Sequence, residues 1–365
     1  MLFCYPIEAA SENWLHDGLM TLLTRVFAGD ADPLANWLAV FPLDKRAEIA
    51  RKRSILTALE AVAARGARLS AKRRAAYLAC MQSQNQLPAI FEPAEALSDT
   101  PDGPAAFSRA VANLFDVAFK ALASLGVRDR QYAQVYAAMP AHICPFCGIE
   151  PMSSPDPRIP RESLDHYLSS SQYPFAAANL RNLAPAGNRC NSSHKLAVDM
   201  LRDAGGVRRR CFDPFGQLVA GVSLINSSPL EGSVEKMTVL PAWQIDLLGD
   251  LDLIATWDDV YKIRTRYRLN ILDAEFRHWL DHLANWAVKE AEPPTTQGEL
   301  IALLNRYRQA VIGDGFADFL KIATFEMLVH HCENGAASDR VTAWLIGLLS
   351  PETGAAAFPD DAVAA

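Results

Sequence analysis

The side chains best suited to bind a metal lie between His142 and Lys195. Cys144 and Cys147 are separated by two residues, and this gap lets both thiolates reach one tetrahedral zinc ion. Cys190 follows downstream and offers a third soft ligand. The chain has seven cysteines, an odd number, and the other four are scattered. In a reducing compartment a close cysteine pair of this kind predicts a metal site before a disulfide.

Further polar residues follow in a fixed order around the cysteines: Asp165 and His166, then Asn182, and Asn191 directly after Cys190. The set resembles the HNH nuclease family, whose fold is ββα-metal. The shared pattern is a Cys-x-x-Cys, an Asp-His about eighteen residues on, an Asn-Leu, and a Cys-Asn that opens a helix. It covers about fifty residues and is specific, whereas a lone Cys-x-x-Cys is weak evidence. The stretch DHYLSSSQYPFAAANLRNLAP is especially similar to stand-alone bacterial HNH proteins of antiviral defence loci, found beside an ATPase.

This resemblance implies a metal-dependent endonuclease. His166 would be the general base, and Asn182 would brace the loop that bears it. Asp165 and Asn191 would hold a catalytic Mg²⁺ or Mn²⁺. The residue types suit phosphodiester hydrolysis, because a neutral imidazole takes a proton from water and a hard cation on oxygen ligands neutralises the phosphate. DNA is the expected substrate, and the sequence does not separate it from the RNA of an RNA-cleaving HNH toxin.

The sequence departs from the family pattern at two positions. Many members carry a fourth cysteine three residues before Cys190, where this chain has Gly187. His194 follows Cys190 by four residues on the presumed helix, so both side chains share a face and His194 could complete a Cys3His zinc site. His142 is a less favoured substitute, and a knuckle that packs without metal is the other alternative. Relatives often carry lysine at the His194 position, so the expected phosphate contact shifts to Lys195.

Positive charge is concentrated in two places, although the formal net charge of the chain is −7. One is the run from Asp44 to Arg74, and the other is the cluster Arg208, Arg209 and Arg210. We expect the arginine cluster to contact the phosphates of a nucleic acid without reading its sequence. Two alternatives stay open for the basic runs. In the first, both basic runs are ordinary solvated helix surface. In the second, the run from Asp44 to Arg74 docks an acidic partner subunit.

A different class of function also fits the cysteines, namely a zinc-knuckle module that binds nucleic acid or protein without cutting it. Asp165, His166 and Asn191 argue against that alternative, because a pure binder needs none of them. The large helical flanks of the small core suggest a subunit that docks onto something else. The family habit points to an ATPase or another defence protein as that partner.

The elements around the site predict a mostly α fold with a small α+β insert. Apolar residues at helical spacing predict helices over 11–26, 43–64, 70–81, 105–125, 297–311, 315–332 and 339–349, and one long helix over 257–290. Two β-like runs, GQLVAGVSLI and VEKMTVL, predict an antiparallel hairpin. The expected regions are an N-terminal helical region (1–135), a nuclease core with zinc knuckle (136–215), the β-hairpin (216–240), a C-terminal helical region (241–352) and a flexible tail (353–365).

Composition sets the remaining limits. With 365 residues, half of them hydrophobic, the chain is long enough for two or three domains with real cores. No run of eighteen apolar residues occurs, so no membrane-spanning helix is expected. The first residues lack a basic region followed by a cleavable apolar stretch, so the expected compartment is the cytoplasm.

Overall fold

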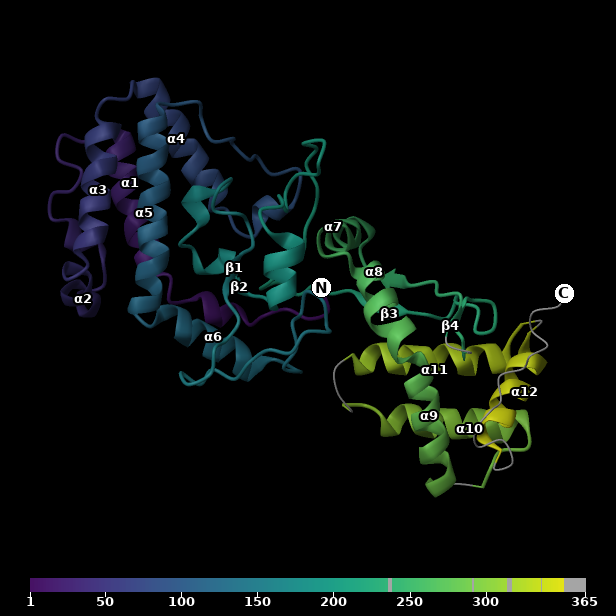
Figure 1. Cartoon of the computed structure of the whole chain (residues 1–365). Helices are drawn as coiled ribbons and strands as arrows, with labels where there is room; N and C mark the ends of the chain where they lie inside the picture. Colours follow the sequence, from purple (N-terminus) through teal and green to yellow (C-terminus); the bar gives the residue numbers. More distant parts are fainter. Residues whose placement is uncertain (236–237, 291, 314–316, 336, 351–365) are drawn as a thin grey trace. The chain divides into compact units, whose positions relative to one another are not determined.

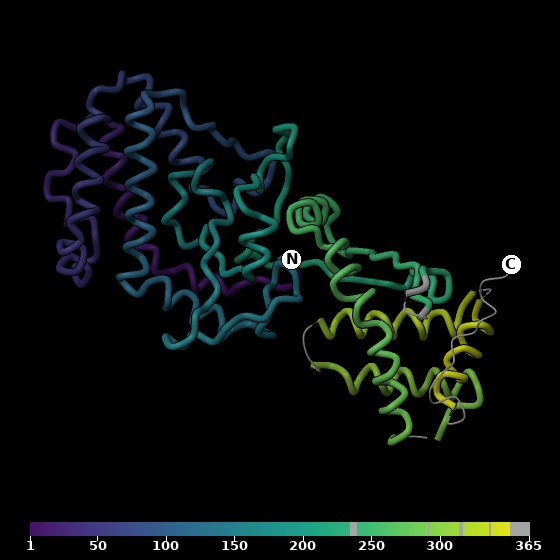
Figure 2. Tube along the Cα trace, in the orientation of Figure 1, coloured from purple at the N-terminus to yellow at the C-terminus, as the bar shows by residue number. Residues whose placement is uncertain are grey.

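The computed structural model describes residues 1–235, 238–290, 292–313, 317–335 and 337–350, and these form a mostly helical protein with short paired strands (Figures 1 and 2). The chain divides into two compact units. The first unit is Met1–Val219 with Asp252–Tyr261, and the second is Ala220–Leu251 with the described residues from Lys262 onward. The expected N-terminal helical region and nuclease core therefore belong to one unit. The tail expected at 353–365 lies outside the described residues.

Helices α1 to α6 build the N-terminal part of the first unit. In α1, residues at helical spacing such as Leu15, Leu19 and Leu22 are fully buried, so the apolar periodicity correctly predicts the inward face. Helices α1, α3 and α5 lie side by side (Figure 1), and Gly66 permits this, since a Cβ there would lie 2.6 Å from Val26 Cγ1. The bounds are α1 Trp14–Ala28, α2 Arg46–Ala50, α3 Arg53–Gly66, α4 Ala71–Gln84, α5 Ala105–Ser124 and α6 Val127–Ala138.

Two local predictions in this region differ from the structure. The single helix expected over 43–64 is interrupted, because Lys52 leaves the helical region with ψ 67° and separates α2 from α3. Helix α6 was not expected; it follows Gly126, whose φ of 67° turns the chain sharply after α5. Among the described helices none is long and apolar enough by itself to cross a membrane, and α5 with α6 meets that test only as a pair bent by 65°.

The centre of the first unit is a short antiparallel pair, β1 (Leu164–His166) with β2 (Leu183–Pro185). After β2 comes η7, a π-helix over Cys190–Lys195. The expected ββα core stays a prediction, because the element after β2 is a π-helix of only six residues. The coarse prediction of a mostly helical chain with few strands is confirmed, and the described strands form two-stranded sheets.

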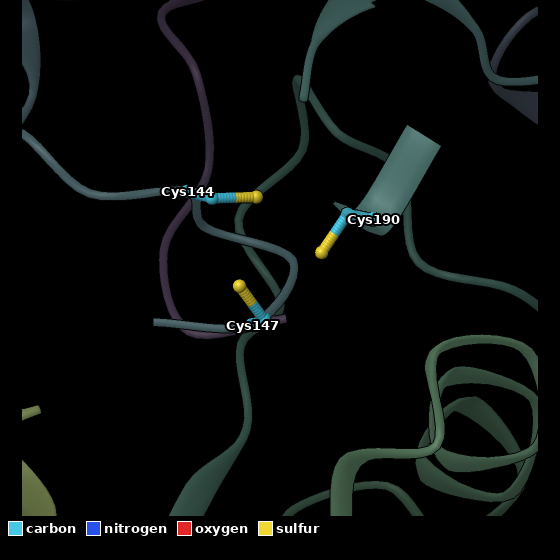
Figure 3. Close-up of side chains that lie close together, drawn as sticks. All are labelled: Cys144, Cys147 and Cys190. Atoms are coloured by element: carbon cyan, nitrogen blue, oxygen red, sulfur yellow. The ribbon is translucent and has the colours of Figure 1, made fainter. Parts of the chain in front are cut away.

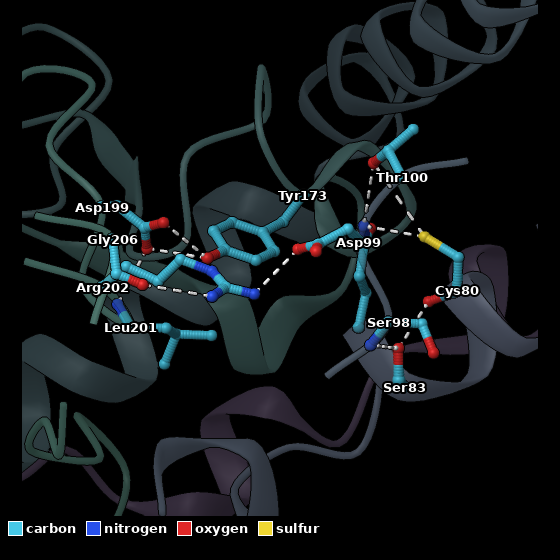
Figure 4. Close-up of polar contacts among 11 residues, drawn as sticks. Cys80, Ser83, Ser98, Asp99, Thr100, Tyr173, Asp199, Leu201, Arg202 and Gly206 are labelled. Carbon is cyan, nitrogen blue, oxygen red and sulfur yellow. Dashed lines mark hydrogen bonds and ion pairs between the residues drawn. The ribbon is translucent and has the colours of Figure 1, made fainter. Parts of the chain in front are cut away.

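Polar contacts hold the chain after η7 against the proline-containing loop that precedes α5 (Figure 4). Arg202 Nη2 lies 2.8 Å from Asp99 Oδ1 in that loop. The Tyr173 hydroxyl donates to the Asp199 carboxylate at 2.7 Å, and the Leu201 N–H donates to the same carboxylate at 2.8 Å. These bonds anchor the chain that follows η7.

Helix α7 (Leu251–Tyr261) completes the first unit beside the cysteine segment. Trp257 is almost fully buried, and its indole N–H donates to the carbonyl of Phe146 at 2.7 Å. The Phe146 ring also stacks on Tyr167 and Tyr261, at centroid distances of 5.9 and 5.2 Å. The residues between Cys144 and Cys147 are thus held by aromatic packing as well as by their own turn.

The second unit contains helices that pack around Tyr307 and Phe325, whose rings lie 4.8 Å apart. The long helix expected over 257–290 is wrong, since it is broken at Lys262, which adopts a left-handed φ of 54°. Helix α7 before the break belongs to the first unit and α8 after it to the second. The bounds are α8 Ile263–Tyr267, the π-helix η8 Arg268–Leu272, α9 Asp273–Glu290, α10 Gln297–Ala310, α11 Asp318–Glu333 and α12 Ser338–Leu349.

The hairpin expected within 216–240 is also wrong. The first run forms β3 (Gly221–Ser223), whose partner is the later strand β6 (Asp246–Leu248). The second run pairs with itself, as β4 (Val234–Glu235) with β5 (Thr238–Val239). Alternation of apolar residues identifies a strand but does not choose its partner. Here β3 packs against α11, where a ring nitrogen of His331 lies 3.1 Å from the Ile225 carbonyl oxygen.

Candidate functional site

The β1–β2 pair holds Asp165 and His166 as neighbours on one strand, opposite Ala184 and Leu183 respectively. Successive side chains on a strand project to opposite faces, so the two side chains have different surroundings. Asp165 is buried, whereas His166 is partly exposed. The candidate site therefore has an imidazole side and a carboxylate side.

On the imidazole side, His166 is held as a neutral base. Its Nε2 lies 3.0 Å from the carbonyl oxygen of Ala177, and since a carbonyl can only accept, Nε2 carries the proton. Nδ1 then carries the lone pair, and within the described part of the chain it makes no hydrogen bond. Burial, together with the charges of Lys195 and Arg128, lowers the pKa of His166 to about 4. The ring is therefore neutral at neutral pH and can accept a proton at Nδ1.

Two residues beside His166 were missed by the sequence analysis. The Phe119 ring of α5 lies 4.4 Å from the His166 ring, and the Arg128 guanidinium of α6 lies 4.3 Å from the same Phe119 ring. Arg128 makes no ion pair with any described carboxylate, and its Nε is buried without a hydrogen-bond partner. An unneutralised guanidinium next to a neutral imidazole suits an anion such as a phosphate. No local pattern links residues so far apart in the sequence.

On the carboxylate side, Asp165 forms a buried ion pair with Lys195. Nζ lies 3.2 Å from Oδ2 and 3.4 Å from Oδ1, and it also donates to the His166 carbonyl at 2.6 Å. Burial raises the pKa of Asp165 to about 6, against the opposing effect of Lys195. The expected phosphate contact of Lys195 is corrected by this arrangement, because its side chain is 1% exposed and directed into the protein.

The two asparagines, Asn182 and Asn191, differ in burial and in the hydrogen bonds of their side chains. Asn182 is fully buried, and its amide donates to the carbonyls of Leu168 and Ala176 while its oxygen accepts from the Leu168 N–H at 2.6 Å. It thus ties together the connection that follows His166, and its bracing role in catalysis stays a prediction. Asn191 is partly exposed in η7, and its side chain makes no hydrogen bond to any described residue.

The side-chain oxygens of Asp165 and Asn191 are of the type that a hard divalent cation prefers as ligands. Both are oxygen ligands, and Asp165 Oδ2 receives no hydrogen bond of ordinary geometry even with the Lys195 ammonium nearby. The same ammonium already neutralises the carboxylate. A metal ion at Asp165 therefore competes with the Lys195 ammonium for the Asp165 carboxylate.

The three cysteines of the motif converge, as expected (Figure 3). The sulfur atoms of Cys144, Cys147 and Cys190 all lie within 4.8 Å of one another, and all three residues are fully buried. The Cys147 and Gly148 N–H groups both donate to the Cys144 carbonyl, and Gly148 adopts φ 70°, which closes the turn. Three thiols that share one buried point form a cluster that could hold a metal ion.

The histidines expected near this cluster lie apart from it. Within the described part of the chain, no histidine ring nitrogen joins the three sulfurs at that 4.8 Å spacing, so the predicted Cys3His set with His194 is not assembled. His194 is partly exposed in η7. His142 is exposed and packs on the Tyr136 ring at 4.0 Å.

The side chains of Arg208, Arg209 and Arg210 bind other groups of the protein, whereas the sequence predicted that they contact the phosphates of a nucleic acid. Arg208 donates to the carbonyls of Ile90 and Glu92, at 2.7 and 3.0 Å. Arg209 and Arg210 form ion pairs of 2.7 and 2.8 Å, with Asp259 and Glu92. The three residues therefore attach their segment to the loop before α5 and to α7. In the other basic run, several side chains stay exposed: Arg51, Arg53, Arg65, Arg68, Lys72 and Arg73.

Taken together, the groups of the candidate site can accept a proton at His166 of β1, bind an anion at Arg128 of α6 and bind a soft metal ion at the cysteine cluster. Comparison of the chain with protein-family models, with curated proteins and with solved structures found no match. The function is therefore inferred from the chemistry of these residues and from their order in the sequence.

Proposed function

We propose that the chain is a metal-dependent endonuclease of the HNH type that hydrolyses phosphodiester bonds in DNA. The observation that supports this proposal most directly is the state of His166. Its ring is neutral, its proton is fixed on Nε2 by the Ala177 carbonyl, and Nδ1 is left to act as a base. A histidine packed only for structure has no need of an unneutralised arginine such as Arg128 beside it.

In the proposed reaction, His166 Nδ1 takes the proton from the attacking water, and Arg128 binds the phosphate. Asn182 contributes indirectly, since its three hydrogen bonds hold the chain that leads to the Ala177 carbonyl and so orient the ring. When bound by Asp165 and Asn191, Mg²⁺ or Mn²⁺ would neutralise the phosphate and stabilise the departing oxygen. Lys195 would have to withdraw from Asp165 to allow this binding, or share the carboxylate with the cation.

We also propose that the cysteine cluster holds a structural Zn²⁺. The segment 139–160 contains six prolines and has little regular structure, so a metal at Cys144 and Cys147 would order it. Through Cys190 the same ion would fix the first residue of η7, and with it the neighbouring Asn191. In this proposal zinc positions the site and takes no part in the chemistry.

The wider biological role is proposed from the resemblance of the motif alone. It suggests a cytoplasmic effector nuclease of an antiviral defence system, with an ATPase or another defence protein as partner. An RNA-cleaving toxin would use the same residues. The exposed basic side chains between Asp44 and Arg74 would serve either a nucleic acid or an acidic partner surface.

A second candidate function is a non-cleaving zinc-knuckle module that binds nucleic acid or protein. The observation that favours it is the buried ion pair of Asp165 and Lys195, because a carboxylate neutralised inside the protein is a structural feature rather than a cation site. This candidate leaves the free Nδ1 of His166 and the unneutralised Arg128 without a role.

The decisive experiment is cleavage of supercoiled plasmid and of single-stranded RNA, with Mg²⁺ or Mn²⁺ and with chelator. The proposal expects metal-dependent nicking of plasmid by the wild type. It also expects a loss of about 10²- to 10⁴-fold or more in His166→Ala, since a general base contributes that much. His142→Ala is the matched control, as that histidine is exposed and outside the site. Equal cleavage by wild type and His166→Ala would exclude this catalytic assignment, and binding without cleavage would favour the second candidate.

A further inference from the structure

The cysteine cluster offers three sulfurs, whereas a structural zinc site takes four ligands. The residues next to the three sulfurs include a candidate for the fourth ligand. Gly187 donates its N–H to Cys144 Sγ at 3.3 Å, so it borders the cluster directly. A Cβ added at Gly187 would lie 2.6 Å from Oε2 and 2.8 Å from Cδ of Glu150. The Glu150 carboxylate therefore fills the place that a side chain at position 187 would occupy.

We propose that Glu150 is the fourth ligand, and that the site is a Cys3Glu zinc site. Glu150 Oε1 lies 3.6 Å from Cys147 Sγ. In a tetrahedral zinc site with a Zn–O bond of about 2.1 Å and a Zn–S bond of about 2.3 Å, the oxygen and sulfur lie about 3.6 Å apart. The spacing of these two atoms is thus already that of two ligands of one ion. The Glu150 carboxylate also carries the same charge as the fourth cysteine thiolate that many members of the family that the sequence resembles have at the position of Gly187.

The backbone around Glu150 holds its carboxylate in this place. The Glu150 carbonyl accepts a hydrogen bond from the Cys144 N–H at 2.8 Å, so residue 150 is tied to the first cysteine. Its other carboxylate oxygen, Oε2, accepts from the Arg189 N–H at 2.8 Å, directly before Cys190. One oxygen is anchored by the backbone at the start of η7, and the other is directed to the sulfur of Cys147. Glu150 therefore bridges the two chain segments that supply the cysteines.

His194 is the rival ligand, because it follows Cys190 by four residues. Neither a His194 ring nitrogen nor a Glu150 oxygen lies within 4.8 Å of all three sulfurs, but Glu150 Oε1 lies 3.6 Å from Cys147 Sγ and its carboxylate is the group next to Gly187. Comparing Glu150 with His194 therefore decides the ligand set. The assignment does not depend on nuclease activity, because bound metal is measured directly.

The test uses the full chain loaded with Zn²⁺ and, separately, with Co²⁺, whose absorption reports its ligands. Wild type is expected to bind one zinc per chain, and Glu150→Gln to bind it at least tenfold more weakly in a chelator competition. Glu150→Cys should keep the zinc and raise the sulfur-to-cobalt charge-transfer absorption by about one third, four thiolates in place of three. His194→Ala is the matched variant and should leave affinity and spectrum unchanged.

Three outcomes would overturn the assignment. They are wild-type protein without zinc after metal-free purification and reloading, an unchanged zinc affinity and cobalt spectrum in Glu150→Gln, or a loss of zinc in His194→Ala alone. If Glu150→Gln does not fold, Glu150→Cys still decides the question. Its added charge-transfer band appears only when position 150 faces the metal.

Discussion

Lys195 and Asp165 form an ion pair across the candidate site, with Nζ 3.2 Å from Oδ2 and both side chains almost fully buried. The lysine comes from the end of η7 and the aspartate from β1, so the pair also joins these two elements. A buried pair of this kind costs desolvation, and removal of one partner leaves an uncompensated charge. Since Asp165 is also the proposed cation ligand, the behaviour of this pair separates a metal site from a purely structural contact.

Lys195→Met should lower the free energy of unfolding by about 1–3 kcal/mol, because Asp165 loses its counter-ion inside the protein. If Asp165 binds a divalent cation, millimolar Mg²⁺ should then raise the melting temperature of the variant more than that of the wild type. Thermal unfolding with Mg²⁺ and with chelator measures both effects. Lys120→Met, which removes an exposed lysine of α5, serves as control. An equal response of variant and wild type to Mg²⁺ would argue for the structural contact.

Arg128→Gln should weaken the binding of a phosphodiester substrate while leaving the fold intact, because Arg128 has no carboxylate partner to lose. We expect a drop of about tenfold or more in kcat/KM, since a charged hydrogen bond contributes about 1.5–3 kcal/mol. Arg128→Lys should recover part of that loss. Arg130→Gln on the same helix is the control, as Arg130 is already paired with Glu12 at 2.8 Å. Full activity of Arg128→Gln would remove this residue from the proposed mechanism.

Cys144→Ser should release bound zinc and lower the melting temperature, because the segment has little regular secondary structure and loses the cross-link that the metal provides. Cys80→Ser is the matched control, since Cys80 is equally buried but lies in α4, away from the cluster. Elemental analysis combined with calorimetry measures both quantities. Chelation of the wild type should reproduce the melting temperature of Cys144→Ser. A wild type that melts at the same temperature with and without zinc would contradict the structural role.

The triple variant with glutamine at Arg208, Arg209 and Arg210 should be less stable by about 1–4 kcal/mol. Each of these arginines is partly buried and bonded to carbonyls or carboxylates of the protein. The salt dependence of DNA binding should change little, because the guanidinium groups are turned toward their internal partners. A titration from low to high salt gives the slope of binding against salt concentration. A slope reduced by about 0.9 per lost contact would instead restore the predicted phosphate clamp.

Stability should fall in acid because of His16, which is buried in α1. Burial lowers its pKa to about 3, below the ordinary value near 6.5, so protons bind preferentially to the unfolded chain. The contribution is complete above pH 6.5 and is lost as the pH falls toward 3. The loss is about 1.4 kcal/mol per pH unit, or about 2 kcal/mol at pH 5. His16→Gln should flatten this slope in denaturant titrations, and His142→Gln should not. Identical slopes in wild type and His16→Gln would show that His16 is not responsible.

Many local features followed from the sequence alone. The apolar spacing of Leu15, Leu19 and Leu22 predicted α1 and its buried face, because a helix repeats every 3.6 residues wherever it packs. The spacing of Cys144 and Cys147 predicted a shared ligand position, because a two-residue turn brings both sulfurs to one point. The order of Asp165, His166 and Asn182 predicted a candidate site in this stretch, and its role as a nuclease site stays a prediction.

Only the tertiary structure decided which distant groups meet. Lys195 was expected to contact a phosphate, and its position against Asp165 depends on how η7 packs on β1. Arg128 reaches His166 through Phe119 because α5 and α6 cover that side of the hairpin, and Glu150 reaches the cysteines because Gly187 leaves the space. Strand β3 likewise pairs with β6 rather than with its neighbour in sequence. Periodicity and spacing report local geometry, whereas these contacts depend on the packing of segments far apart in the chain, where charge, volume and hydrogen bonds must be satisfied together.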